Sequence, residues 1–287
     1  STPLLLFWKE TDFSTGTLGS PYKTSTPAGG IGDYADAPYN TETDYPADNS
    51  RVVVMGLCPS AMTTADSHTT YSLPSRAGLT DVLVTPNGVT GSRKQPFGRA
   101  LEFAHAAVRI VLKARRTDNT VGKLYVKNLK LTVPSRLVCG GVKWDTGVKH
   151  YVAAPASADL VIDHPGQILS TEDTQIAVFY LIPCATNDLL TDISSSGTPG
   201  LTLTADVAKD VNFTTGARKA SFPVLDGNLN FMDQSGTPVT QLQSGESYGT
   251  TLNFDIDSFT LEGEEKEWED GGKMTIPVVV PEPVPSA

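Results

Sequence analysis

The sequence lacks long hydrophobic runs, a full set of paired cysteines and an excess of positive charge. No uninterrupted apolar segment in the 287 residues approaches the roughly 20 that a bilayer-spanning helix needs. The formal net charge of -10 disfavours nucleic acid as a partner, because the phosphate backbone attracts clusters of Lys and Arg. The three cysteines form no C-x-x-C pair, and an odd number cannot pair completely within the chain. We therefore expect buried free thiols at Cys58, Cys139 and Cys184.

Sequence motifs of enzymes are also missing. The four histidines are isolated, with neither H-E-x-x-H nor H-x-H spacing, so no zinc site is expected at His68, His105, His150 or His164. No G-x-S-x-G elbow, P-loop or dinucleotide-binding fingerprint is present. His105 is interpreted as a strand residue in the core or at an interface, with ring nitrogens bonded to the backbone. The sequence thus predicts no catalytic residue, no cofactor and no metal site, and a protein that is not an enzyme.

Two acidic segments and three tryptophans leave binding functions open. The segments "GDYADAPYNTETDYPAD" and "EGEEKEWED" contain carboxylates that could bind calcium, but neither has EF-hand spacing, so solvated charge runs are expected. Trp8, Trp144 and Trp268 could stack on sugars, although single tryptophans in β proteins are more often core residues. These residues support glycan binding only as an alternative function.

What the sequence contains is a series of short β-rich segments. They are "RVVVMGL", "DVLVT", "LYVKNLKLTV", "DLVID", "IAVFYLI", "LTLTADV", "TLNFDIDSF" and "KMTIPVVV". The connections between them are rich in Gly, Pro, Asn, Asp, Ser and Thr, with 25 Gly and 20 Pro in the chain. In "GESYGTTLNFDIDSF", Tyr248, Leu252 and Phe254 alternate with polar residues, as in a strand with one face in a core. The predicted fold class is all-β.

The segment 100–116, "ALEFAHAAVRIVLKARR", fits both a helix and a strand by periodicity. Read as a strand, Leu101, Phe103 and His105 share one face. From Val108 onwards the apolar residues occupy even-numbered instead of odd-numbered positions, a change of parity. The segment 124–133 also changes parity, and a β-bulge produces such a change because one extra residue reverses the faces beyond it. The prediction is a bulged strand over 100–114 that pairs antiparallel with 124–133.

The same motifs carry a resemblance to a known family. "TDVLVT" followed by "LEFAHAAVRIVLKA", then "VKNLKL" and "VKWDTG", is similar to the fimbrillin-like family, the type V pilus subunits of Gram-negative anaerobes. "DYPADNSRVVVMGLCPS" resembles the family's Y-P segment and following strand, although "GLCPS" stands where an aromatic-rich Y-x-P is usual. "FYLIPCA", "LQSGESYGTTLNFDI" and "EKEWEDGG" resemble later family segments, so the resemblance runs in order through most of the chain.

The resemblance implies two β-sandwich domains of transthyretin-like type in tandem. It also implies export as a lipoprotein, with the lipidated Cys upstream of Ser1, and assembly into surface fibres by strand exchange. A turn at "WDTGVKH" and the following "YVAAPASADL" suggest a domain boundary near residue 150, which gives halves of ordinary domain size, 1–150 and 151–287.

Both ends of the sequence contain candidate exchange strands. Near the C-terminus, one face of segment 273–280 carries Met274, Ile276, Val278 and Val280. The Pro-rich tail that follows cannot continue a ladder. In the family a terminal strand can add to a neighbouring subunit through main-chain pairing. A competing donor is the N-terminal "LLLFW", where one face carries Leu4, Leu6 and Trp8. Segment 273–280 could also be an ordinary edge strand of the second domain.

The functional hypothesis is a structural subunit of a cell-surface fimbria, as stalk, anchor or tip, that contributes to adhesion. The expected partners are other copies or other fimbrial subunits, and surface glycans or proteins. The expected location is the outer membrane or the fimbrium, with membrane contact only through the upstream lipid anchor. The alternative is a surface glycan-binding lipoprotein, and a weaker third option is a secreted hydrolase with paired carboxylates in a cleft.

Overall fold

A computed structural model gives the fold of this chain. It describes residues 3–14, 21–26, 39–40, 45–60, 63–65, 70–73, 77–85, 88–96, 101–116, 125–145, 148–153, 159–166, 170–185, 201–208, 210–214, 218–223, 237–254, 259–267, 273–274 and 278–279. These residues form strands with very little helix, and the sheets are open rather than closed into barrels. The prediction of an all-β protein is confirmed.

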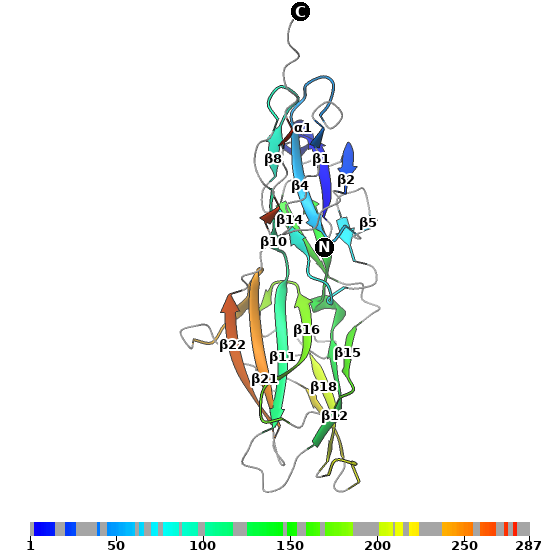
Figure 1. The fold of residues 1–287 in the computed structure, drawn as a ribbon, viewed down its shortest axis with the longest axis vertical. Helices are drawn as coiled ribbons and strands as arrows, with labels where there is room; N and C mark the ends of the chain where they lie inside the picture. The colour runs from blue at the N-terminus through cyan, green and yellow to red at the C-terminus, as the bar shows by residue number, and fades with distance from the viewer. Residues whose placement is uncertain are drawn as a thin grey trace, which may run out of the picture.

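Two sheets build what we call the upper lobe, the upper half of Figure 1. The larger sheet has the order β10 (Ala104–His105), β7 (Leu83–Val84), β4 (Val52–Cys58), β1 (Leu4–Lys9), β2 (Lys23–Ser25), and β8 (Val89–Gly91) also pairs with β4. The smaller sheet has the order β14 (Val148–Ala153), β13 (Cys139–Asp145), β6 (Thr70–Ser72), β5 (Thr63–Ala65). The short helix α1 (Glu10–Ser14) follows β1.

Two four-stranded sheets build the lower lobe (Figure 1). The first has the order β16 (Thr174–Leu181), β11 (Val108–Arg116), β21 (Glu246–Phe254), β22 (Phe259–Glu267). The second has the order β15 (Leu160–His164), β12 (Tyr125–Val133), β18 (Thr202–Ala208), β19 (Arg218–Pro223). The 3₁₀ turn η1 (Ser135–Leu137) follows β12.

Three further strand pairs are short. They are β17 (Cys184–Ala185) with β20 (Gln241–Leu242), β23 (Lys273–Met274) with β9 (Leu101–Glu102), and β24 (Val278–Val279) with β3 (Tyr39–Asn40). The last two pairs join the C-terminal part of the chain to its N-terminal half.

The core of the lower lobe lies between its two sheets. On β11 the buried positions alternate with half-buried ones, and Val108, Ile110 and Leu112 all point into the core. The facing strand β12 contributes Leu129 and Leu131 to the same cluster. This alternation is what a strand needs when only one of its faces is covered.

The larger sheet of the upper lobe is buried on both faces. Every residue of β4 is buried, because Val53, Met55 and Leu57 pack in one cluster whereas Val52 and Val54 pack in another on the opposite face. A strand covered on both faces needs a continuous apolar sequence rather than an alternating one, which explains the run "VVVMGLC". The three cysteines are buried thiols outside any disulfide, as predicted.

The structure corrects the interpretation of segment 100–114. The segment is extended, but it forms β9, β10 and β11, which belong to three different sheets. The parity change before Val108 marks the passage from the upper lobe to the lower lobe rather than a bulge. The predicted pairing with 124–133 is wrong, because β11 pairs antiparallel with β16 and parallel with β21, whereas β12 lies in the other sheet.

The parity change predicted in 124–133 does come from a bulge. The register of β12 on β18 shifts between Lys127 and Lys130, where Asn128 has a φ of 51°. Asparagine tolerates this left-handed conformation better than most residues, so the sequence accommodates the extra residue there.

The core clusters bear on how the chain is organised into domains. Residues 108–138 and 176–252 supply the lower core, whereas Cys139 and Val142 return to the upper core. The clusters therefore do not separate at a single point of the sequence. The division into 1–150 and 151–287 stays a prediction.

Gly141 provides a test of the packing between β13 and β6. Its φ is 153°, and an added Cβ would collide with the backbone carbonyl of Tyr71 on the paired strand. We expect Gly141→Ala to lower the free energy of unfolding by about 2 kcal/mol or more, measured by urea denaturation. Gly166→Ala is the matched control, because its Cβ would meet only the movable ring of His164 at 3.1 Å. Equal stability of the two variants would contradict this packing.

Candidate functional site

The N-terminal candidate strand, β1, lies inside a sheet. It pairs with β4 over all six residues from Leu4 to Lys9, and with β2 over Leu5 to Phe7. Leu6 and Trp8 are buried in one core cluster, against which Leu4 packs as a half-buried residue. The predicted common face of Leu4, Leu6 and Trp8 is therefore present, and it faces the core.

The opposite face of β1 is buried as well. Leu5 and Phe7 lie in the cluster on the other side of the sheet. Four consecutive large side chains are thus removed from water, and each contributes about 1.5–3 kcal/mol of hydrophobic stabilisation. If β1 left the sheet, the core clusters on both of its faces would lose the side chains that β1 contributes.

The C-terminal candidate strand is held much less firmly. Met274 lies in β23, whose ladder consists of Lys273 with Glu102 and Met274 with Leu101. Val278 lies in β24, whose ladder consists of Val278 with Tyr39 and Val279 with Asn40. Ile276 and Val280 lie outside the described residues. Two residue pairs per ladder give few main-chain hydrogen bonds, so this segment can separate from the fold at a lower cost than β1.

His105 is a buried strand residue, as the sequence predicted, but its partner is a carboxylate. Its Nδ1 lies 2.7 Å from Oδ2 of Asp81, which precedes β7. Because an ionised carboxylate only accepts hydrogen bonds, Nδ1 donates. The prediction of a backbone partner missed Asp81, which nothing in the sequence placed near His105.

The Cys139 thiol is not a reactive group. Burial raises the pKa of the Cys139 thiol to about 12, and the negative charge of Asp81 acts in the same direction. Only the thiolate is nucleophilic, so Cys139 is inert at neutral pH.

No described residues form a cluster of three or more His, Cys, Asp or Glu that could hold a metal ion. His68 and Trp268 lie outside the described part of the chain, as does most of the acidic segment 32–48, whereas residues 262–267 of the second acidic segment lie in β22. Trp8 is a core residue, which removes it as a platform for sugars. No helix among the described ranges is long and apolar enough to cross a bilayer.

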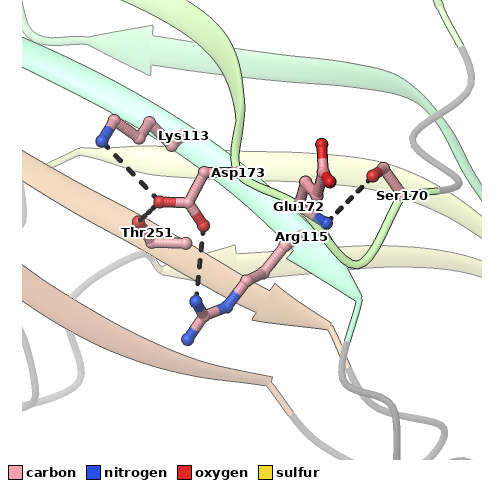
Figure 2. A network of polar contacts seen from close by, with 6 residues as sticks. All are labelled: Lys113, Arg115, Ser170, Glu172, Asp173 and Thr251. Carbon is pink, nitrogen blue, oxygen red and sulfur yellow. Dashed lines mark hydrogen bonds and ion pairs between the residues drawn. The ribbon is translucent and has the colours of Figure 1, made fainter.

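A polar network crosses the outer face of the lower lobe (Figure 2). The Asp173 carboxylate accepts a hydrogen bond from Thr251 Oγ1 at 3.2 Å and from Arg115 Nη1 at 3.5 Å, and Lys113 Nζ lies 3.7 Å away. These residues connect the start of β16 with β11 and β21. The register between β11 and β16 shifts between Leu112 and Lys113, so the network lies where the ladder is interrupted.

We expect Asp173→Ala to lower the free energy of unfolding by less than about 1 kcal/mol, because the carboxylate is partly exposed and water screens its ion pairs. The loss should become smaller as the salt concentration is raised to about 1 M. Urea denaturation at low and high salt measures both effects, with Asp163→Ala on β15 as the control. A salt-independent loss of several kcal/mol would contradict this assignment.

Comparisons with known proteins give structural matches only. No protein-family model matches the sequence, and no curated protein matches it. A solved structure described as a "putative cell adhesion protein" from Bacteroides uniformis matches with a TM-score of 0.53 and 14% identity, covering 93% of this chain and 91% of its own.

Two further solved structures match less closely. A fimbrial protein from Bacteroides vulgatus has a TM-score of 0.41 and 14% identity, covering 78% of this chain and 79% of its own. The tip fimbrial protein from Porphyromonas gingivalis with C-terminal truncation has a TM-score of 0.39 and 9% identity, covering 93% and 94%. The structural neighbours are thus described as fimbrial proteins or as "putative cell adhesion" proteins, and the chain shares its fold with the Bacteroides uniformis protein.

Proposed function

We propose that this chain is a structural, non-enzymatic subunit of a cell-surface fimbria and contributes to adhesion. The observation that carries the proposal is the return of the C-terminal strands β23 and β24 to the N-terminal half, where two short ladders hold them. The shared fold with a protein described as a "putative cell adhesion protein" and the motif resemblance to the fimbrillin-like family support it.

Within this proposal the two lobes are β-sandwich domains of transthyretin-like type. The subunit is a lipoprotein of the outer membrane, anchored through a lipidated Cys upstream of Ser1. Its partners are other copies of the chain or other fimbrial subunits.

Segment 273–280 is the proposed exchange strand. It already pairs through its main chain with two different parts of the upper lobe, so the same pairing can be made with a neighbouring subunit. Because each ladder has only two residue pairs, the exchange gives up few contacts within the subunit. By contrast, exchange of β1 would expose four core side chains, which makes β1 the weaker candidate.

Deletion of residues 273–287 tests this proposal. We expect loss of fibres with little change in the urea midpoint, because each of the two deleted ladders has two residue pairs and so gives few main-chain hydrogen bonds. Electron microscopy of producing cells, with immunogold against this chain, measures assembly. Truncation after Val280 is the control and should leave fibres intact.

Gold in rows along filaments in the unmodified strain would identify a stalk subunit, and gold only at filament ends would identify a tip subunit. Unchanged fibres in the 273–287 deletion would remove the exchange role of this segment. Gold on the cell body without filaments would contradict the fimbrial function itself.

A further inference from the structure

The second sheet of the lower lobe ends in β15 on one side and in β19 on the other. Each of these strands pairs with one neighbour among the described strands. β15 lies at the right-hand side of the lower lobe in Figure 1, and within the described ranges its main chain pairs only with β12. An unpaired edge presents a row of N–H and C=O groups to which a further strand can bind.

β15 has an apolar inner face and one carboxylate on its outer face. Leu160 and Ile162 are half-buried and pack against the lower core. Val161 is 43% exposed, and Asp163, which lies beside Lys130 of β12, is exposed as well. The strand contains no proline, and its ladder with β12 has no register shift. The backbone of β15 therefore has neither of the two features, proline and a bulge, that commonly block an edge.

β19 carries the opposite charge. Its sequence is RKASFP, which begins with two basic residues. In register, Lys219 lies beside Asp206 of β18, whereas Ala220 lies beside Ala205, which is buried in the lower core. Successive residues of a strand lie on opposite faces of the sheet. Lys219 therefore occupies a position on the outer face, as Asp163 does.

The strand directions allow this sheet to continue from one copy of the chain into the next. Every neighbouring pair in the order β15-β12-β18-β19 is antiparallel, so β15 and β19 run in opposite directions. A second copy placed beside the first in the same orientation therefore brings its β19 antiparallel to β15 of the first copy. Antiparallel strands form ladders of main-chain hydrogen bonds perpendicular to the strands.

We propose that β15 of one chain pairs antiparallel with β19 of a second copy, with Asp163 opposite Lys219. In a continuous sheet only residues on the same face can lie directly opposite one another. The register that satisfies this condition and pairs the opposite charges also places Leu160 opposite Phe222 on the inner face. Apolar positions then meet on one face of the joint and opposite charges meet on the other.

The charges favour this pairing over pairing of identical edges. A row of alternating charges crosses the joint, formed by Asp206 and Lys219 of one copy followed by Asp163 and Lys130 of the other. Opposite charges across neighbouring strands stabilise a sheet, whereas like charges destabilise it. Two β15 edges would bring Asp163 of both copies onto the same face of one joint. The edge strand β22 of the other lower sheet, FTLEGEEKE, is acidic as well and so is a poorer partner for β15.

A single joint of this kind is weak, and repetition strengthens it. Stable interfaces bury about 1,600 Å² in total, and a strand of five residues supplies much less. Two fibres that lie side by side would repeat the joint at many subunits, and linked joints bind more tightly than separate ones. Such bundling of fibres rests on the proposed fimbrial function, whereas the pairing of β15 with β19 is a property of the chain alone.

Sedimentation velocity of the full-length chain at concentrations up to about 1 mM tests the pairing, because weak interfaces associate only at high concentration. We expect the unaltered chain to self-associate. Asp163→Lys and Lys219→Asp should each weaken association about three- to tenfold, since each places like charges opposite one another. The variant with both substitutions should regain association in part, because like charges then lie beside Lys130 and Asp206 within each copy. The control is Asp12→Lys, which makes the same change of charge as Asp163→Lys on α1 of the upper lobe and should have no effect.

An unaltered chain that stays monomeric at this concentration would overturn the proposal, as would single variants that associate as strongly as the unaltered chain. Urea denaturation shows whether each variant folds. If Asp163→Lys does not, Val161→Lys on the same edge replaces it, with Val211→Lys as its control, because Val211 is 44% exposed but lies outside the strands.

The sedimentation experiment contains no fibres. A chain that associates through these edges but forms no fibres on cells would therefore contradict only the fimbrial function. Fibres built from a chain that does not associate through these edges would contradict only the edge pairing.

Discussion

The passage of one extended segment through both lobes is the constraint on which the rest of the structure depends. Residues 101–116 supply β9, β10 and β11, and each strand belongs to a different sheet. The segment binds the C-terminal strand β23, forms an edge of the upper sheet and forms an inner strand of the lower sheet. Because the backbone between these strands has no slack, a shift of either lobe would disturb pairing in the other.

The strands were predictable from the sequence, but the sheets were not. Alternation of apolar and polar residues identified β21, whereas periodicity alone left the segment that contains β11 open between helix and strand. The continuous run at 52–58 reflects burial on both faces. The error concerned partners, since β11 and β12 follow each other in sequence and yet lie in opposite sheets. The parallel partner of β11, β21, lies far along the chain, and hydrophobic pattern alone does not specify so distant a pairing.

The candidate site was predictable only as a pair of segments. The one-sided apolar pattern marked both ends of the chain, and the structure distinguishes them by the number of residue pairs in their ladders. Leu6 and Trp8 lie in the core of the upper lobe, whereas Met274 and Val278 lie in ladders of two residue pairs. The link between His105 and Asp81 was invisible in the sequence, because a lone histidine and a lone aspartate in separate segments carry no signal of proximity.

The parallel pairing of β11 with β21 also determines the order of events during biosynthesis. Both partners of β11, Thr174–Leu181 and Glu246–Phe254, are made after it. Until the last of them has been synthesised, the apolar face of β11 has no complete sheet to join, and non-local pairing of this kind forms slowly. The lower lobe can therefore fold only when nearly the whole chain is available, so a chain in transit across a membrane would remain unfolded and would need protection from aggregation.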